Sequence, residues 1–284
     1  MNQQSFYLLG VIIFGLLFNQ GHVYSFLIKY IIMLMLFFIF LEAKFTGTIS
    51  IYLGTIYIFL AMLGISFSAY YLISFINQDI AAIAFLIGIT PTATAAPVMI
   101  RLLKKDVNYV VSAVILTNCL VAVSIPFFLP LITTVENISV KNMLFSTLIV
   151  VILPFLLAKI INFKQIKLNS SIFFYLWLTA LYLATAKSSH YIFIESTTIP
   201  IITIIAIAAV AMLLCVTNFY LGMLIGKKQY YRETSQSLGQ KNTMFMIWIA
   251  LTFVSPLAAL GPMFYLIFQN IYNSYLLNNG SKLK

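Results

Sequence analysis

The stretch SLGQKNT, residues 237–243, is a polar island inside an otherwise apolar segment of membrane-spanning length. Its lysine, Lys241, would cost about 3 kcal/mol near the centre of a bilayer, so a lysine there is a functional-site hypothesis by default. We expect no acidic side chain inside the membrane segments to pair with it. The lysine should therefore lie in a cavity that holds water, backbone carbonyls or an anion.

The rest of the chain has the composition of an integral membrane protein. Hydrophobic residues make up 62% of its 284 residues and charged residues 8%, with a mean hydropathy of +1.05. Soluble domains carry about 25% charged residues. Residues 1–20 lack the basic start and the cleavage site of a signal peptide, so we expect a helix of the mature protein there. Cys119 and Cys215 lie in apolar runs and predict buried, free thiols.

The apolar runs predict an all-α polytopic membrane protein with ten transmembrane helices and no soluble domain, because each span needs about 20 apolar residues. The predicted limits are 5–19, 23–42, 49–76, 80–101, 107–132, 143–163, 170–187, 198–226, 230–253 and 256–278.

The basic residues predict the orientation of these spans. Loops after odd-numbered spans hold only Lys141 and Lys187, whereas most of the other basic residues lie in loops after even-numbered spans or in the C-terminal tail. Basic loops favour the cytoplasmic side, so both termini should be cytoplasmic, in what we expect to be a bacterial inner membrane. The net charge of +10 then reflects topology and gives no indication of nucleic-acid binding.

Two of the predicted spans are broken, and they occupy matched positions. The fourth contains GITPTATAAP, residues 88–97, whose two prolines remove backbone donors from the helical ladder. The ninth contains the 237–243 island, with Gly239 as its flexible point. Each is the fourth helix of a five-helix half, and paired breaks of this kind are the best sequence indication of a transporter binding site. We expect residues 90–94 to meet residues 240–243, since non-helical backbone at membrane depth must line protein or a cavity.

The sequence around both breaks resembles the bile acid:sodium symporter (BASS) family. The stretch GITPTATAAPVM, residues 88–99, followed by residues 105–107, is similar to the family's fourth-helix signature G-x-x-P-G-G-T-A-S-N-V-M with a downstream G-[DN]-V. Later, Gly239 with Asn242-Thr243 fits E-x-G-x-Q-N-S, and residues 255–260 with Asn270 and Ser274 fit the last helix.

The resemblance implies one transmembrane domain with two inverted five-helix repeats, about 1–138 and 139–284. Spans 3–5 and 8–10 would form a core domain in which the broken spans 4 and 9 cross. Spans 1, 2, 6 and 7 would form a panel against which the core moves. Substrates in the family are mostly organic anions, such as bile acids, keto acids and pantoate-like acids, and relatives of similar fold move arsenite or exchange ions.

The chain departs from the family where sodium is bound. Oxygen ligands that the resemblance implies are replaced at Ala96, Pro97, Val110, Val114 and Ser237, and the family's glutamine falls on Lys241. A tethered ammonium at an ion position would repel sodium and could take over its structural role. We therefore expect transport that is not coupled to sodium.

The predicted substrate- and ion-binding residues lie at the two breaks and on neighbouring spans. They are Thr90, Pro91, Thr92, Thr94, Asn118, Ser237, Gln240, Lys241, Asn242, Thr243 and Asn270. For Asn118 and Asn270, as for Thr117 and Asn218, interhelical hydrogen bonding is an equal alternative.

These residues predict a secondary active transporter of a small organic anion that works by alternating access. An ion or proton exchanger of related fold, in which Lys241 gains and loses a proton, is the alternative within transport. A non-transporting membrane sensor is the alternative from another class. We expect no enzymatic activity, cofactor or metal, because no phosphate loop, metal-ligand cluster or catalytic triad is present. The expected partners are the substrate anion, protons as an open coupling ion, and the lipid bilayer, with a monomer favoured.

Lys29, His22 and His190 lie outside the breaks, and we expect none of them to bind substrate. Lys29 in the second span should extend its ammonium to the membrane interface. His22 and His190 should be solvated in external loops.

The orientation is testable with reporter fusions. A reporter after Lys284 should report the cytoplasm, and one inserted within residues 137–141 should report the opposite side, because five predicted spans, an odd number, separate these two positions. Activity of both reporters on one side of the membrane would refute the ten-span arrangement.

Overall fold

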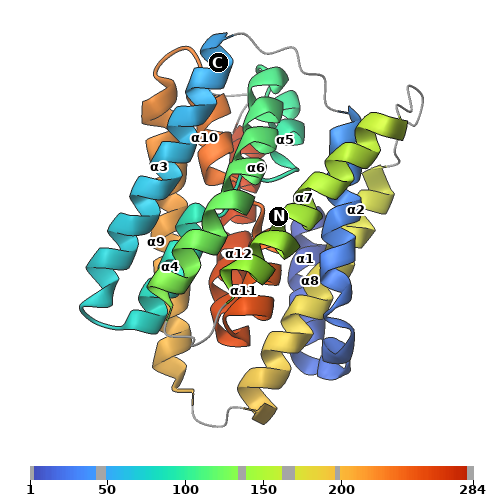
Figure 1. The fold of residues 1–284 in the computed structure, drawn as a ribbon, viewed down its shortest axis with the longest axis vertical. Helices are drawn as coiled ribbons and strands as arrows, with labels where there is room; N and C mark the ends of the chain where they lie inside the picture. Colours follow the sequence, from blue (N-terminus) through green and yellow to red (C-terminus); the bar gives the residue numbers. More distant parts are fainter. Residues whose placement is uncertain (1–2, 43–48, 134–138, 162–169, 196–198, 280–284) are drawn as a thin grey trace.

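The computed structural model describes residues 3–42, 49–133, 139–161, 170–195 and 199–279. Apart from short connections, the described residues are helical (Figure 1). The helices are α1 (Gln3–Leu17), α2 (Leu27–Glu42), α3 (Ile49–Ser74), α4 (Gln78–Ile89), α5 (Ala96–Leu102), α6 (Val107–Ile132), α7 (Val140–Ile161), α8 (Ser170–His190), α9 (Ile201–Gly226), α10 (Tyr231–Gly239), α11 (Thr243–Phe253) and α12 (Pro256–Asn279). A 3-10 helix, η1 (Asn19–Tyr24), precedes α2, and a π-helical turn, η2 (Tyr191–Glu195), follows α8.

The chain is an all-helical integral membrane protein. Within the described residues, four helices are long and apolar enough to cross a membrane: Leu53–Ser74 of α3, Val107–Ile132, Val140–Ile160 of α7 and Ile201–Gly226. Leu27–Leu41, Gln78–Ile89 and Thr243–Phe253 are shorter apolar helices. A helix occupies each of the apolar runs that the sequence analysis identified, and both segments expected to be broken are divided into two helices.

The starts of the helices around the breaks follow from their capping residues. The side chain of Asn77 accepts a hydrogen bond from Ile80 N at 2.9 Å at the start of α4. Asp106 accepts one from Asn108 N at 2.9 Å at the start of α6. These side chains satisfy backbone donors that a helix leaves without partners in its first turn.

Helices α1, α2, α7 and α8 pack as one group. Helix α8 packs against α1 and α2, and α2 packs against α7, on the right-hand side of Figure 1. On the other side, α3 packs against α4 and α6, and α9 packs against α10 and α12. Helices α11 and α12 lie between these groups.

The histidines differ from their sequence-based interpretation. The expectation that both are simply solvated is wrong, because the rings of His22 and His190 stack at 3.7 Å with an interplanar angle of 17°. His22 Nδ1 also lies 2.9 Å from Asn19 O. The difference arises because residues 19–24 form η1, which holds this connection against the end of α8, and because α2 begins only at Leu27 instead of residue 23.

A glycine allows α10 to approach α9 closely. A Cβ atom at Gly222 would lie 2.6 Å from Ser235 Cα and 2.7 Å from Thr234 O. Across the same contact, Ser235 Oγ donates a hydrogen bond to Phe219 O at 2.9 Å. Small residues permit close helix contact in membrane proteins, so Gly222 fixes the position of α10.

We expect Gly222→Ala to lower stability, because the added methyl group would meet backbone atoms that cannot rotate away. Overpacking of this kind costs about 1–3 kcal/mol. Gly64→Ala on α3 is the matched control, since a Cβ there meets nothing within 4 Å, and alanine is favoured over glycine in helices by about 1 kcal/mol. Thermal unfolding of the purified variants, followed by helical circular dichroism, should show a lower Tm for Gly222→Ala alone. Equal Tm values would contradict the close packing.

Candidate functional site

The two breaks cross each other. Residues 90–95 connect α4 to α5, and residues 240–242 connect α10 to α11. Thr92 and Lys241 form an antiparallel β-bridge. Its backbone hydrogen bonds run from Ala93 N to Gln240 O at 2.8 Å and from Asn242 N to Pro91 O at 2.7 Å. The predicted meeting of the two broken segments is confirmed.

Four helices meet at the crossing: α4 and α10 end there, and α5 and α11 begin there. Helix α4 packs against α11 at one end of the crossing, and α5 packs against α10 at the other end (Figure 1). The carboxyl ends of α4 and α10 and the amino end of α11 therefore converge at the bridge. Carbonyl and N–H groups that helix ends leave without intrahelical partners are thus concentrated at one place.

Local sequence explains the end of α4. Pro91 has no N–H and disfavours helical geometry in the residue before it. Thr90 accordingly has an extended ψ of 126°. Its hydroxyl turns back and donates to Leu86 O at 2.6 Å, which caps one carbonyl of the last turn. The carbonyl of Gly88 in the same turn remains available for a donor from outside the helix.

Lys241 supplies that donor. Its side chain is 1% exposed, and Nζ donates a hydrogen bond to Gly88 O at 2.9 Å. The partner is a backbone carbonyl, one of the possibilities that the sequence analysis gave. Because the carboxyl end of a helix carries partial negative charge, the position favours a cation. The ammonium thus joins the break of α10–α11 to the end of α4.

The last helix holds the lysine backbone. Gln269 of α12 accepts a hydrogen bond from Lys241 N at 2.8 Å, and its amide nitrogen donates to Lys241 O at 3.4 Å. The neighbouring Asn270, a predicted site residue, is turned away, because its amide donates to Leu266 O of its own helix at 2.7 Å. Tyr265, one turn earlier, donates through its hydroxyl to Gly239 O at 2.7 Å. Sequence analysis missed Gln269 and Tyr265.

Helix α6 holds the other break. Thr92 N donates to Thr117 Oγ1 at 3.0 Å, and Asn118 Nδ2 donates to Thr92 O at 3.0 Å. Asn118 Oδ1 also accepts from Asn242 Nδ2 at 3.0 Å, so one side chain binds both breaks. Asn118 therefore lies at the crossing as predicted, and it makes interhelical hydrogen bonds there as the alternative interpretation proposed.

The remaining predicted residues also have defined places. Thr92 Oγ1 donates to Ser237 O at 2.6 Å, and Thr243 N donates to Lys241 O at 2.9 Å where α11 begins. Asn242 caps α11 by accepting from Phe245 N at 3.4 Å. Thr94 is only half-buried and follows the bridge.

Helix α10 is polar but buried. Glu233, Gln236, Ser237 and Gln240 each have a buried side-chain oxygen without a hydrogen-bond partner among the described residues, and so does Asn218 on the neighbouring α9. The four residues of α10 and its cap recur at helical spacing and share one face. Buried polar atoms are ordinarily satisfied by protein, water or ligand. This face leads to Lys241. Sequence analysis predicted Ser237 and Gln240 but missed Glu233 and Gln236, although the polar stretch RETSQSLG, residues 232–239, was their signal.

Glu233 corrects one expectation about charge. An acidic residue was not expected inside the membrane segments, but Glu233 lies within the ninth and is 3% exposed. One of its carboxylate oxygens accepts from Asp106 N at 3.0 Å, which ties the first turn of α10 to the start of α6. The expectation failed because the polar segment was taken to begin at Ser237, whereas Glu233 lies four residues earlier in the same predicted span.

Hydrocarbon fills the other side of the crossing. Ala96, Val110, Ala113 and Leu238 belong to one buried apolar cluster that also includes Tyr109. Val114, one turn further along α6, is also fully buried. In the part of the chain that the structure describes, no three His, Cys, Asp or Glu side chains gather as a metal site would require. Cys119 and Cys215 are free thiols, as predicted; Cys215 is buried as expected, whereas Cys119 is only half-buried.

No protein-family model matches the chain, and no curated protein sequence is significantly similar to it. The site is therefore interpreted from its geometry.

We expect Gln269→Leu to destabilise the protein, because the substitution leaves the buried Lys241 N without its acceptor. An unsatisfied buried donor costs about 1–3 kcal/mol. Asn270→Leu is the matched control, since that amide binds only its own helix. Urea or thermal unfolding in detergent should show a clear loss for Gln269→Leu and a change within about 0.5 kcal/mol for Asn270→Leu. The reverse order would contradict the assignment of Gln269.

Proposed function

We propose that this protein is a secondary active transporter of a small organic anion, works by alternating access, and is not coupled to sodium. One observation carries the proposal: the buried ammonium of Lys241 binds the carbonyl of Gly88 where two broken helices cross. In transporters, broken helices at the repeat interface hold substrate and coupling ions, and helix carboxyl ends coordinate the cations. Here a side-chain cation occupies such an end.

The order of the helices supports a repeated architecture. A long helix, a broken pair and another long helix occur as α3, α4–α5 and α6, and again as α9, α10–α11 and α12. We propose that these are the cores of two inverted five-helix repeats, about 1–138 and 139–284, with ten membrane crossings in all. On this proposal α1, α2, α7 and α8 form the panel against which the core moves. The antiparallel crossing of the broken pairs is the expected relation of two inverted units.

The ammonium would serve two roles at the crossing. It neutralises the partial negative charge where α4 ends, which a bound cation does in ion-coupled relatives of this architecture. It also has three N–H donors, of which Gly88 O occupies one. The capped amino end of α11 starts beside it and attracts negative charge. An anion passing the crossing would therefore meet favourable charge.

Apolar packing argues against a sodium site. The resemblance to the BASS family implies oxygen ligands at positions that Ala96, Val110 and Val114 occupy, and all three side chains are fully buried. Ala96 and Val110 pack in the same cluster as Leu238. Sodium needs several oxygen ligands, which hydrocarbon cannot supply, and the nearby ammonium would repel it.

A proton-coupled exchanger is the second candidate. The partnerless polar face of α10, from Glu233 through Ser237 to Gln240, leads to Lys241 and favours water or proton access from the α5–α10 side. On this alternative the ammonium itself is the group that exchanges a proton during each transport cycle. It differs from the first candidate in what is carried, because an exchanger moves an ion against protons and needs no organic anion.

Uptake into proteoliposomes tests the main proposal. Radiolabelled pyruvate, pantoate and taurocholate represent the three acid classes implied by the resemblance. We expect at least one to enter equally in sodium and choline buffers, and Lys241→Met to reduce that uptake by more than about tenfold, equivalent to about 1.4 kcal/mol. Lys159→Met, on an exposed position of α7, is the matched control and should retain uptake. Strong sodium dependence of the unmodified protein, or full uptake by Lys241→Met, would refute the proposal.

Alternating access also predicts that the buried crossing opens. Thr92 is fully buried and Asn242 is 7% exposed. We expect Thr92→Cys and Asn242→Cys to react with a small polar thiol reagent in membranes, because transport must expose the crossing to water. Ala113→Cys, equally buried but in the apolar cluster, should stay unreactive, and Lys228→Cys on the exposed α9–α10 connection should react fully. Inert cysteines at both crossing positions would contradict an opening.

A further inference from the structure

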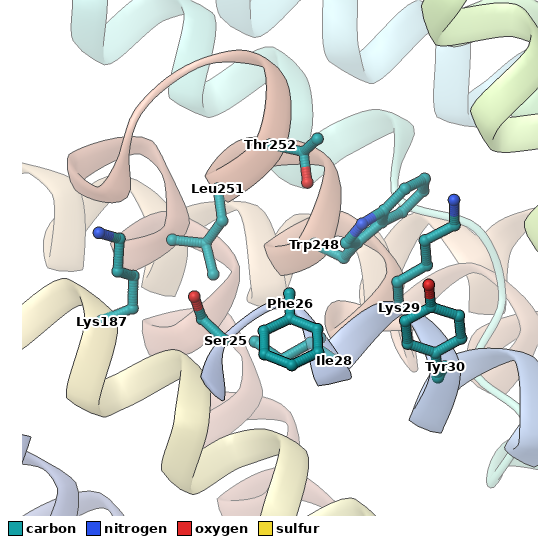
Figure 2. A pocket seen from close by; sticks show the side chains of 9 residues that line it. All are labelled: Ser25, Phe26, Ile28, Lys29, Tyr30, Lys187, Trp248, Leu251 and Thr252. Carbon is teal, nitrogen blue, oxygen red and sulfur yellow. The ribbon is translucent and has the colours of Figure 1, made fainter. Parts of the chain in front are cut away.

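Basic side chains gather at two places outside the crossing. One is a cavity of about 300 Å³ between α2, α8 and α11, lined by Lys29, Lys187 and Trp248 among others (Figure 2). Lys29 Nζ lies 6.0 Å from the centroid of the Trp248 ring, within cation–π range, whereas the sequence analysis expected it at the membrane interface. Lys187 has an interaction partner of its own. The charges of this cavity therefore indicate no ligand.

The other place is where the connection between α5 and α6 meets the connection between α9 and α10. Helix α5 packs against α10, and α6 packs against α10 as well. Asp106 N, at the start of α6, donates a hydrogen bond to a carboxylate oxygen of Glu233 on α10 at 3.0 Å. Lys105 Nζ lies 5.7 Å from the centroid of the Tyr231 ring, across the same contact. The two connections and the helix ends beside them thus form one surface.

This surface carries an excess of positive charge. Its two acidic residues are engaged in the fold, because Asp106 caps α6 and Glu233 is 3% exposed. The six basic residues of the surface, which we call the basic patch, are Arg101, Lys104, Lys105, Lys227, Lys228 and Arg232. Arg232 is half-buried and the other five are exposed. Within the part of the chain that the structure describes, none of the six forms an ion pair with an acidic side chain.

Two lysines of the basic patch occupy backbone positions that suit glycine. Lys104 follows the end of α5 with a φ of 54°, and Lys227 follows the end of α9 with a φ of 50°. Glycine is the usual residue with positive φ after a helix end, because a side chain disfavours that conformation. The positive-inside rule accounts for basic residues in cytoplasmic connections, but a neighbouring unstrained position would satisfy it equally well. A lysine at this position in both connections indicates that the charge is used there.

The surroundings of the basic patch suit a phospholipid. On the predicted orientation both connections face the cytoplasm, at the ends of apolar segments. The last turns of α5 and α9 expose Leu102 and Leu224, at 59% and 55%, which offer contacts for acyl chains. Arg232 Cζ lies 4.9 Å from the centroid of the Tyr231 ring, on the headgroup side of these leucines. Guanidinium groups bind phosphate through paired hydrogen bonds, and basic pockets between helices on the cytoplasmic side bind phospholipid headgroups.

We infer that the basic patch binds the headgroup of an anionic phospholipid, with its phosphate between the two connections. The inference goes beyond the proposed function and does not depend on it. Helix α5 runs from the crossing to the patch, and α10 runs from the patch to the crossing. A lipid bound here joins the outer ends of both helices and stabilises the arrangement of the two broken segments from the membrane surface.

Native mass spectrometry of the delipidated protein in detergent tests the site. The probes are cardiolipin, whose headgroup carries two phosphates, and zwitterionic phosphatidylethanolamine with the same acyl chains. We expect saturable retention of cardiolipin and little retention of phosphatidylethanolamine. Lys104→Gly combined with Lys227→Gly should raise the cardiolipin concentration at half-occupancy at least about tenfold, because it removes two charges from the patch. The Tm of this double variant without lipid should not fall, since glycine suits both backbone positions.

Matched variants separate charge from backbone conformation. Lys104→Arg combined with Lys227→Arg keeps both charges and should retain cardiolipin. Lys105→Gln combined with Lys228→Gln removes two charges without changing the residues at positive φ, and it should weaken retention as the glycine pair does. Lys159→Gln, at an exposed position of α7 outside the patch, should leave retention unchanged.

Three results would overturn the inference. They are equal retention of the two lipids, an unchanged half-occupancy concentration in both charge-removing pairs, and retention of inorganic pyrophosphate, titrated separately, as tight as that of cardiolipin. The last result would identify a site for free phosphate compounds instead of a lipid. Because the assay measures binding alone, its failure refutes only the lipid site, and a failure of anion uptake refutes only the proposed transport.

Discussion

The hydrogen bond from Lys241 Nζ to Gly88 O is the interaction on which the rest of the site depends. A buried ammonium without a carboxylate loses its hydration, which costs several kcal/mol unless other groups replace the water. The end of α4 supplies a carbonyl and partial negative charge, but only because Pro91 ends the helix there. The bridge between Thr92 and Lys241 then brings the lysine to that end, and Asn118 and Gln269 satisfy the backbone that both breaks expose.

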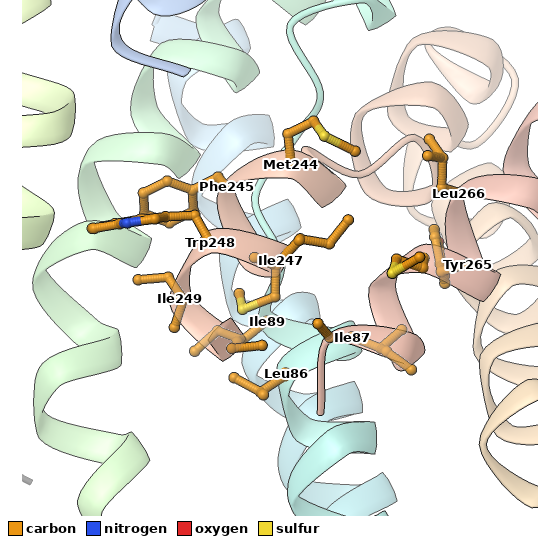
Figure 3. Packing of buried hydrophobic residues seen from close by; sticks show 14 of the residues in the cluster. Leu86, Ile87, Ile89, Met244, Phe245, Ile247, Trp248, Ile249, Tyr265 and Leu266 are labelled. Carbon is orange, nitrogen blue, oxygen red and sulfur yellow. The ribbon is translucent and has the colours of Figure 1, made fainter. Parts of the chain in front are cut away.

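The surroundings of this bond are apolar on one side and polar on another, an arrangement compatible with the proposed transport. Hydrocarbon from α5 and α6 packs on one side, and polar side chains of α10 line another. Figure 3 shows the dense packing of Leu86, Ile87 and Ile89 of α4 against Ile247 and Ile249 of α11. That packing joins α4 to α11 directly beside the crossing.

The sequence was sufficient for features that depend on local patterns. Apolar runs located the helices, and prolines and a polar island located the breaks, because hydrophobicity and missing backbone donors act within a few residues. It could not choose Gln269 over Asn270, since adjacent helical residues point about 100° apart and the rotation of α12 is set by tertiary packing. Burial of Glu233, the stacking of His22 on His190 and the cavity beside Lys29 likewise arise from contacts between distant segments. Hydropathy carries no information about such contacts.

The central claim is that the Lys241 ammonium stands in the place of a bound sodium ion. Equilibrium binding of radioactive ²²Na⁺ to the purified protein measures this most directly, because it requires no knowledge of the substrate. The account predicts no saturable sodium binding by the unmodified protein, with or without added organic acids. Saturable, stoichiometric binding of ²²Na⁺ while Lys241 is intact would contradict it.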